Sequence, residues 1–547
     1  MSSSNKHPRG LPFLFLAEMW ERFGYYLIIG IFTFYLKDTV AKGGFEMNES
    51  DASNMYGTFI AFVFLTPFLG GLLADRILGY RRSIIIGGIM MAIGYCLMSV
   101  HNIQALYVAM GLICLGNGFF KPNISTLLGN LYNDEPYKAN KDAGFNIFYL
   151  GINVGAFISN FFAAAMYLTY GWGAAFITAG VGMFIGVIVF VIGTRHYRHA
   201  DILKPVSPED MPLKQIFLQV FLPAFVVGTV AYSFPETPLV KDKMTDAFLF
   251  ACLPIIYYYY NIYRRATERE RAPIAALLAV FFVSIAFWAV FKQNGAMMNT
   301  WAKRYTDREV PAALQSTLNT LNLTEIVTAD TIEGKIVDNQ FRNLKTVGDK
   351  DSVGKTVNQY LLNLSKDKQP KPGSQIYTFA PNLSQSVNPF WVIILTPLVV
   401  LLFAWMRRRK TEPSTPDKIA LGLIISALSM FIMLGAVAAS QNGATKASLL
   451  WFVGTYAVLT LGELCLSPMG LSLVSKLSPP RLTALMMGGW FLATSIGNKM
   501  AGVLSSMWDE YDDKRTPFII NIFLLFASAA IIIGMLKWLR RIFHENK

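Results

Sequence analysis

Seven ionisable side chains lie inside apolar runs of the sequence, where a charge is expensive. A charged side chain at the centre of a bilayer costs roughly 2.5–3.5 kcal/mol, so these residues must face one another or a water-filled cavity. One interpretation is a set of buried ion pairs that joins helices. We favour the other, a hydrated functional pathway, because buried ion pairs stabilise proteins poorly. The residues are Glu18, Glu21, Arg22, Lys121, Lys292, Glu463 and Lys499.

The first apolar run carries a continuous polar face. At about 100° per residue, its polar positions fall on one stripe about 140° wide. A helix facing lipid would not place carboxylates, a guanidinium and phenols on one side, so we expect the stripe to line a hydrated cavity. A glutamate there could exchange protons with water. The stripe comprises Glu18, Glu21, Arg22, Tyr25, Tyr26 and Ile29.

A second polar stripe follows one face of the run near 142–168. Its amides could hydrogen-bond a peptide-like group or simply join helices, and the sequence leaves both interpretations open. The stripe comprises Asn146, Tyr149, Asn153 and Asn160.

The composition excludes a soluble protein. Of the 547 residues, 53% are hydrophobic and only 15% are charged, and the mean hydropathy is +0.40, whereas soluble domains have about 25% charged residues. The net charge of +13 does not indicate a nucleic-acid partner, because the basic residues stand at alternate ends of apolar runs, as in the cytoplasmic loops of membrane proteins. All four cysteines lie within apolar runs, so we expect no disulfides.

The apolar runs predict an all-α polytopic membrane protein with fourteen transmembrane helices. With both termini inside, the short cytoplasmic segments carry about 26 Lys and Arg and the short external loops about seven, which satisfies the positive-inside rule. The predicted spans are 11–36, 53–75, 82–100, 103–124, 142–168, 173–194, 214–233, 245–263, 273–298, 387–406, 417–440, 446–474, 483–506 and 516–540.

One long polar stretch, 299–386, interrupts the predicted helices on the external side. It mixes amphipathic pieces with turn residues, so it is either a small folded cap or a long mobile loop.

We expect no metal site and no cofactor, because no cluster of metal ligands and no catalytic arrangement falls within the spans. The chain is therefore not expected to be an enzyme.

Several motifs, in order along the chain, resemble those of the proton-coupled oligopeptide transporter (POT) family of the major facilitator superfamily. The most specific is EMWERFGYY at Glu18–Tyr26, which follows the pattern Glu-x-x-Glu-Arg-Phe-x-Tyr-Tyr. The others are GLLADRILG at Gly71–Gly79, FKPNIS at Phe120–Ser125, FYLGINVGA at Phe148–Ala156, GELCLSPMG at Gly462–Gly470 and MGGWFL at Met487–Leu492. The resemblance covers almost the whole chain except 299–386.

The resemblance implies the major facilitator fold. Two six-helix bundles, 1–200 and 273–547, would rock around a central site, and 201–272 would link them through an inserted hairpin of two helices, as in prokaryotic members. It also implies proton coupling by Glu18, Glu21, Arg22 and Lys121. The cavity would be lined by Tyr25, Tyr26, Lys121 and Asn153 from the first bundle and by Trp288, Glu463, Trp490 and Thr494 from the second. Glu463 would meet the substrate's amino group, while Arg22 and Lys121 would favour its carboxylate.

Three positions depart from the pattern of the family's peptide transporters. Ile29 replaces a second arginine, Lys292 replaces an acidic residue that follows Trp288, and Phe64 replaces a cavity tyrosine. The first two changes together remove an ion pair between the bundles and leave a new cation, which we include among the substrate-binding residues. Its counter-charge could be Glu18, Glu21, Glu463 or the substrate, or Lys292 could pair locally and leave ordinary uptake unchanged.

The sequence thus predicts a secondary active transporter that imports di- and tripeptides by proton symport. The alternative keeps the fold but carries another small anionic or zwitterionic solute with weakened coupling; a receptor built on 299–386 is a more distant rival. The expected partners are small peptides, protons and the lipid bilayer, with no nucleic acid, and the expected state is a monomer in the cytoplasmic (inner) membrane of a bacterium.

Overall fold

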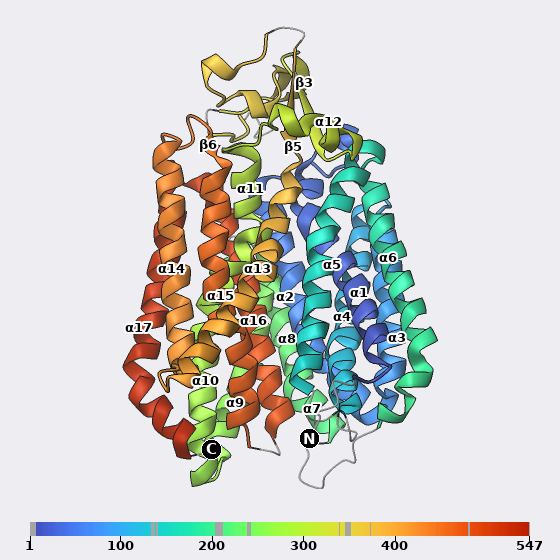
Figure 1. Ribbon diagram of the computed structural model, residues 1–547, viewed down its shortest axis with the longest axis vertical. Coiled ribbons are helices and arrows are strands. Elements are labelled where there is room, and N and C mark those ends of the chain that lie inside the picture. Colours follow the sequence, from blue (N-terminus) through green and yellow to red (C-terminus); the bar gives the residue numbers. More distant parts are fainter. Residues whose placement is uncertain are drawn as a thin grey trace.

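The computed structural model describes residues 7–132, 137, 141–202, 212–237, 242–338, 340–344, 352–371, 374–479 and 482–545. The protein is predominantly helical, and in this described part ten helices are long and apolar enough to cross a membrane. It is an integral membrane protein. The two chain ends lie at one end of the molecule and a small β-containing cap lies at the other (Figure 1).

The first half of the chain forms helices that enclose one hydrophobic core. Tight connections join them: between α5 and α6, Gly171 has φ 84°, a left-handed conformation that favours glycine. The elements are α1 (Leu11–Lys37), η1 (Val40–Lys42), α2 (Glu49–Leu73), η2 (Ala74–Leu78), α3 (Tyr80–Leu97), α4 (Ile103–Leu131), α5 (Lys141–Tyr170), α6 (Trp172–Gly193), η4 (Thr194–His196) and η5 (Arg198–Ala200).

A helical hairpin follows. Its elements are α7 (Leu213–Ile216), η6 (Phe217–Phe221), α8 (Leu222–Ser233) and α9 (Lys243–Arg265). Asp242 caps α9 by accepting a hydrogen bond from the backbone N–H of Thr245 at 2.8 Å, which satisfies one of the free donors of the first turn.

The second half encloses a separate hydrophobic core, to which α9 of the hairpin contributes. Its elements are α10 (Glu268–Phe291), η7 (Lys292–Gly295), α11 (Met297–Arg304), α13 (Val387–Arg408), α14 (Thr415–Ala439), α15 (Leu449–Leu477), α16 (Thr483–Ser506), η12 (Met507–Glu510) and α17 (Arg515–Glu545).

The predicted end of one helix is wrong. We predicted a span over 273–298, but after a break at η7 the chain continues as α11 to Arg304. The break falls where Lys292, Gln293, Asn294 and Gly295 interrupt the apolar pattern, and Gln293 bonds back to Ala289 O at 3.2 Å and across to Asn521 at 3.0 Å. The helical segment therefore ends at Arg304 rather than at the predicted 298.

The described part of the polar stretch is folded as a cap. Strand β2 pairs with β5 in antiparallel register, with Thr324 opposite Phe379, and β3 pairs with β4. Val327, Tyr360 and two leucines form a small core of its own. The elements are β1 (Thr306–Asp307), α12 (Ala312–Thr320), β2 (Thr324–Thr328), β3 (Ile332–Lys335), β4 (Val353–Thr356), η8 (Gln359–Leu361), η9 (Lys366–Lys368), β5 (Gln375–Phe379) and η10 (Pro381–Ser386), with β1 pairing in parallel to β6 (Ala447–Ser448).

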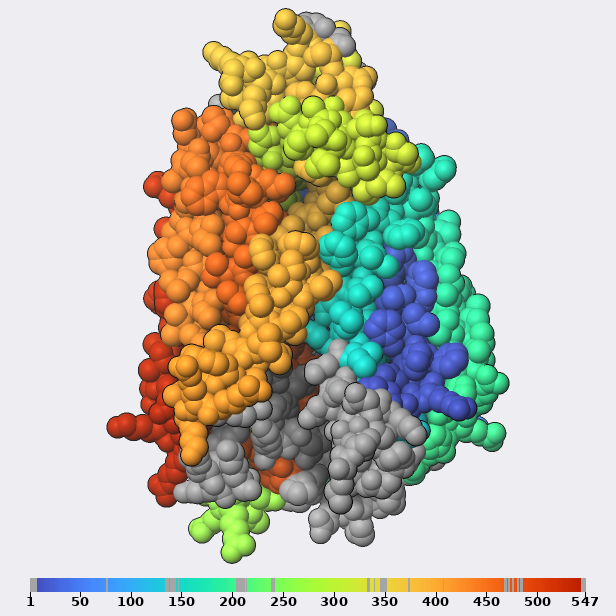
Figure 2. Space-filling view, viewed as in Figure 1, coloured from blue at the N-terminus to red at the C-terminus, as the bar shows by residue number. Residues whose placement is uncertain are grey.

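The cap is attached to both halves of the protein. Toward the first half, Asn382 donates to Asn160 O at 2.7 Å. Toward the second half, Arg342 pairs with Asp512 at 2.6 Å. Figure 2 shows the yellow cap lying across the orange second half and the cyan first half. Any separation of the two halves at this end must therefore deform or release the cap.

Lys446, beneath the cap, makes the stability of this end sensitive to pH. Its ammonium donates to Arg304 O at 3.0 Å and lies 4.1 Å from the Tyr360 ring. Burial and the nearby Arg308 lower the pKa of Lys446 to about 7. Because an unfolded lysine titrates near 10.4, the unfolded state binds more protons between these values, and the free energy of unfolding rises with pH across that window.

We therefore expect Lys446→Met to flatten the rise in melting temperature between about pH 7 and about pH 9. The substitution also removes a hydrogen bond, which lowers the melting temperature at every pH. The test therefore compares how steeply the melting temperature rises with pH, not its absolute value. Lys366→Met, at an exposed position of the same cap, is the matched control and should keep the wild-type slope. An unchanged slope in Lys446→Met would contradict the assignment.

Candidate substrate and proton site

The charged motif of α1 is buried and internally paired. The Arg22 Nη2 donates to Glu21 Oε1 at 2.5 Å, its Nε contacts Glu21 Oε2 and the same Nε lies 3.4 Å from Glu18 Oε1. Asn117 of α4 adds a hydrogen bond to Glu21 at 3.3 Å. By contrast, Glu18 Oε2 has no hydrogen-bond partner in the described residues, so one carboxylate oxygen of this cluster is left for a proton or a water molecule.

Two lysines from opposite halves share one aromatic ring. The Lys121 Nζ of α4 lies 4.3 Å from the centre of the Phe64 ring, and the Lys292 Nζ of η7 lies 5.2 Å from it. Neither ammonium makes a salt bridge within the described part of the chain, although Lys121 is within electrostatic range of Glu18 and Glu21. Both lysines are half-buried, and two ammonium groups without a salt bridge in the described part of the chain attract an anionic group.

A carboxylate of the second half lies within electrostatic range of these cations. Glu463 of α15 accepts a hydrogen bond from Asn388 Nδ2 at 3.0 Å, and its charge acts on Lys292 without an ion pair being formed. The same carboxylate is within electrostatic range of Tyr26 and Tyr149 of the first half. Acidic and basic groups from both halves thus contribute to one electrostatic cluster.

The remaining predicted residues fall into three groups. Tyr25 lies beside the motif, with its ring 4.9 Å from the Arg22 guanidinium and 5.2 Å from the Tyr26 ring. Trp288 is buried and its indole nitrogen has no hydrogen-bond partner in the described residues. The polar groups of Asn153 and Thr494 are engaged in their own helices, Asn153 with Tyr149 O at 2.9 Å and Thr494 with Trp490 O at 2.9 Å.

Lys499 lies apart from this cluster and joins three elements. It donates to Asn54 O of α2 at 3.2 Å, contacts the Thr58 hydroxyl and lies 3.5 Å from Asp242 Oδ2 at the start of α9. It therefore pairs with a residue outside the predicted spans. We assign it to helix packing.

The cap-side ends of the two halves are closed by a polar latch around Glu49. This carboxylate accepts from Lys37 at 3.1 Å and from the Thr300 hydroxyl at 2.8 Å, and it lies 3.4 Å from Arg304. Arg304 also lies 3.7 Å from Asp509. Because Lys37 and Glu49 belong to the first half and the others to the second, this network holds the halves together.

Close backbone packing of α2 against α16 continues the closure. A Cβ atom added to Gly502 would lie 2.8 Å from the Gly57 Cα and from Ser53 O, so the two helices approach at glycine positions where no side chain fits. Ser495 Oγ also donates to Ala61 O at 2.6 Å. The halves are in direct contact on the cap side of the central cluster.

Comparison with known proteins identifies the family. The sequence model of the POT family matches residues 81–338 and 373–521, which is most of the chain. The chain belongs to the POT family. The gap in the match, 339–372, lies within the cap.

Relatives of this POT member match it along nearly their whole length. The peptide transporter YePEPT of Yersinia enterocolitica is 27% identical, over 99% of this chain and 96% of its own. Dipeptide and tripeptide permease A of Escherichia coli is 27% identical, over 98% and 92%. A crystal structure of a peptide transporter POT in complex with sulfate superposes with a TM-score of 0.76 at 27% identity, over 98% of this chain and 96% of the other. The chain is thus a membrane transporter and not an enzyme.

Three residues of the site were not predicted from the sequence. Asn117, which bonds Glu21, stands four positions before Lys121 on the same helix face, so helical periodicity could have found it. Asn388, which supports Glu463, lies in the first turn of α13, and Glu49 lies before the predicted start of the second helix. Neither position carries a local signal, because each has its partner in a distant part of the chain.

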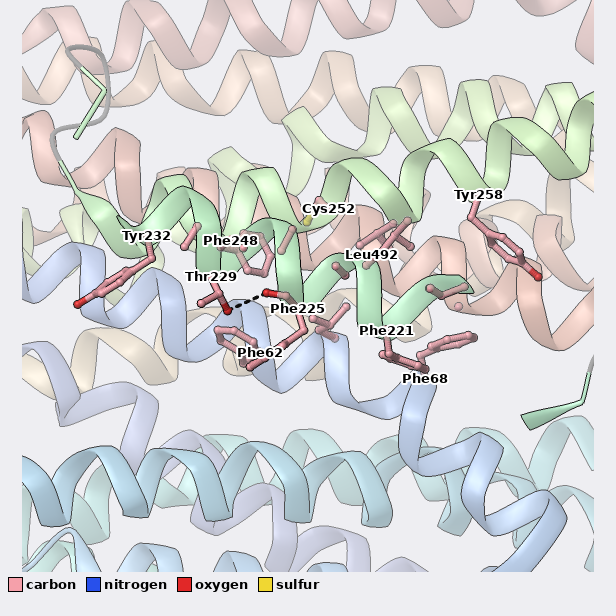
Figure 3. Close-up of a pocket in the computed structure, with 18 of the residues that line it drawn as sticks. Phe62, Phe68, Phe221, Phe225, Thr229, Tyr232, Phe248, Cys252, Tyr258 and Leu492 are labelled. Carbon is pink, nitrogen blue, oxygen red and sulfur yellow. Dashed lines mark hydrogen bonds between the residues drawn. The ribbon is translucent and has the colours of Figure 1, made fainter. Parts of the chain in front are cut away.

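A separate apolar cavity of about 450 Å³ lies between the hairpin and the helices α2 and α16 (Figure 3). In Figure 3 the Thr229 hydroxyl, one of its few polar groups, bonds Phe225 O of its own helix. Because no charged residue lines this cavity, it does not suit a charged solute. Its labelled apolar lining includes Phe62, Phe68, Phe221, Phe225, Phe248 and Leu492.

Among the described residues, no group of three His, Cys, Asp or Glu side chains is placed to hold a metal ion.

Proposed function

We propose that this protein imports di- and tripeptides by proton symport through alternating access. The observation that carries the proposal is a charged cluster formed by both halves: Lys292 lies within electrostatic range of Arg22 and Lys121 of the first half and of Glu463 of the second. A short peptide is a zwitterion and needs opposite charges at opposite ends of one cavity. The names of its relatives, a peptide transporter and a dipeptide and tripeptide permease, support this cargo.

We further propose the major facilitator layout with fourteen transmembrane helices. The two hydrophobic cores support two six-helix bundles at 1–200 and 273–547, with 201–272 as a linker that contains the hairpin. The termini would face the cytoplasm of a bacterium and the cap would lie outside the inner membrane. The protein would act as a monomer in the bilayer.

The proposed substrate orientation follows from the charges. The peptide carboxylate would bind near Lys121 and Lys292, whose ammonium groups make no salt bridge within the described residues. The amino group would bind Glu463, which Asn388 holds in place at 3.0 Å. Tyr25, Tyr26, Asn153, Trp288, Trp490 and Thr494 would complete the walls and accept a range of side chains.

The proposed coupling runs through the α1 motif. In the structure, Arg22 is held by Glu21 and Glu18 and is not free to bind a substrate. A proton arriving at Glu18 or Glu21 would remove one negative charge from Arg22 and release its guanidinium toward the peptide carboxylate. Proton and peptide would then bind together because each favours the form of the site that the other needs.

The proposed cycle begins with opening of the latch around Glu49. Peptide and proton would enter from the cap side, the halves would close again through Lys37, Thr300 and Arg304, and the peptide would leave toward the end that carries the termini. A proton driven by about 100 mV releases about 2.3 kcal/mol. Because a tenfold concentration ratio costs about 1.4 kcal/mol, one proton supports a peptide concentration ratio of roughly fifty-fold.

The cargo can be tested without the proton gradient. In proteoliposomes loaded with unlabelled dialanine, we expect labelled dialanine to enter by counterflow, unlabelled trialanine to inhibit that entry, and free alanine to leave it unchanged. If the folded protein shows no counterflow with dialanine or trialanine, the peptide assignment is wrong, and another small zwitterion or anion becomes the cargo to test.

A further inference from the structure

A polar cavity of about 690 Å³ lies beneath the cap, at the outer end of the first half. It falls within the usual size of ligand sites, about 300–1,000 Å³. In Figure 1 the helix α12 of the cap lies above the cap-side ends of α5 and α6. A small apolar cluster that includes Ala164 of α5 and Leu323 and Ala380 of the cap packs the cap against α5 beside the cavity.

The lining of this cavity contains charges of both signs. Asp38 and Glu325 supply carboxylates, and Lys42 and Lys303 supply ammonium groups. Lys303 is half-buried and makes no salt bridge within the described part of the chain, and its ammonium lies 5.5 Å from the centre of the Phe34 ring. It is nevertheless within electrostatic range of Asp38 and Glu325, so the acid and base ends of the cavity lie close together.

The cavity also has an aromatic wall. Tyr167 and Trp172 are stacked, with ring centres 4.6 Å apart and an angle of 9° between their planes. The Trp172 indole donates to Asp38 Oδ2 at 3.0 Å, which fixes the carboxylate against the wall. Phe34 and Tyr377 line other parts of the cavity. A peptide backbone could lie on such a surface.

We infer that this cavity is an outer binding site for zwitterionic dipeptides, which occupy it before they pass the latch. The peptide carboxylate binds at Lys303 and Lys42. The ammonium group binds at Asp38 and at Glu325, whose Oε2 also lies 3.4 Å from Arg308. An extended dipeptide spans at most about 7 Å, which the cavity accommodates. The inference rests on the proposed function and adds a second site for the same class of substrate.

The position of the cavity beside the latch gives it a role in transport. Asp38 directly follows Lys37, and Lys303 directly precedes Arg304, and both of these neighbours bind Glu49. A peptide held here is therefore concentrated at the entrance. Binding at this site raises the concentration of peptide next to the latch, so the site lowers the apparent KM without changing the maximal rate.

The first test locates the bound peptide directly. The purified full-length protein is irradiated with alanyl-photoleucine, a dipeptide that carries a diazirine, and the adducts are mapped by mass spectrometry. We expect adducts both near the central cluster and at cavity-lining segments such as 167–172 or 322–326. Adducts at the central cluster alone would overturn the outer site and leave the proposed function intact, whereas a protein with no adducts would overturn both.

The second test measures how much the Lys303 ammonium contributes to dipeptide binding at the outer site. Lys303→Gln should remove the outer adducts and raise the apparent KM for dialanine by roughly threefold to tenfold, because one hydrogen bond to a charged group is lost, with the maximal rate unchanged. Lys366→Gln, at an exposed cap position, controls for loss of one positive charge and should change neither. An unchanged KM in Lys303→Gln, or a loss of maximal rate alone, would contradict the inference.

Discussion

Glu21→Gln is expected to abolish the accumulation of dialanine that an inward proton gradient drives. The wild-type concentration ratio can reach roughly fifty-fold per proton at about 100 mV, and we expect the variant to fall to about one. The reason is that Glu21 makes the paired contacts with Arg22, so a permanently neutral amide uncouples the release of Arg22 from protonation. Counterflow of labelled dialanine should persist, because it requires no net proton movement.

Two controls make the Glu21 result specific. Glu309→Gln changes an exposed carboxylate of the cap and should accumulate peptide like the wild type. Thermal unfolding in detergent shows whether the variant is folded, which matters because removing one partner of a buried ion pair can cost about 3–5 kcal/mol. Wild-type accumulation by a folded Glu21→Gln variant would exclude Glu21 from the coupling.

Lys121→Gln is expected to weaken dialanine binding by roughly tenfold to a hundredfold. A hydrogen bond to a charged group contributes about 1.5–3 kcal/mol, and 1.4 kcal/mol is tenfold in affinity. The loss should be confined to substrates with a free carboxylate. Alanyl-alaninamide, which lacks that group, should bind the variant and the wild type with similar affinity, and competition against labelled dialanine measures both. An equal loss for both compounds would contradict carboxylate recognition by Lys121.

Lys292→Gln is the matched comparison, because both ammonium groups face the Phe64 ring. If Lys292 also binds the carboxylate, this variant should show the same selectivity between dialanine and its amide. If Lys292 instead serves only to balance Glu463, the amide and the free peptide should be affected alike. The pair of variants thus separates substrate recognition from local charge balance.

The part of the site predicted most directly from the sequence is the part that lies on one helix. Glu18, Glu21, Arg22, Tyr25 and Tyr26 share a face of α1 because their spacing matches the helical period. Their burial and mutual contacts in the structure agree with a polar interior face. Their roles in coupling and binding stay proposals.

Contacts between distant segments could not be predicted in the same way. Glu49 meets Thr300 and Arg304 across about 250 positions of the chain, and neither side carries a periodic pattern that points to the other. Lys499 pairs with Asp242, which lies outside the predicted spans. Strands β2 and β5 are separated by much of the cap, so their pairing depends on chain closure rather than on local preference.

We propose above that peptide import is coupled to proton import. The most direct measurement is uptake of labelled dialanine into proteoliposomes with an inward proton gradient, followed by addition of a protonophore. Coupling predicts accumulation above the external concentration and its collapse when the protonophore is added. Peptide exchange that ignores the gradient and the protonophore would contradict it.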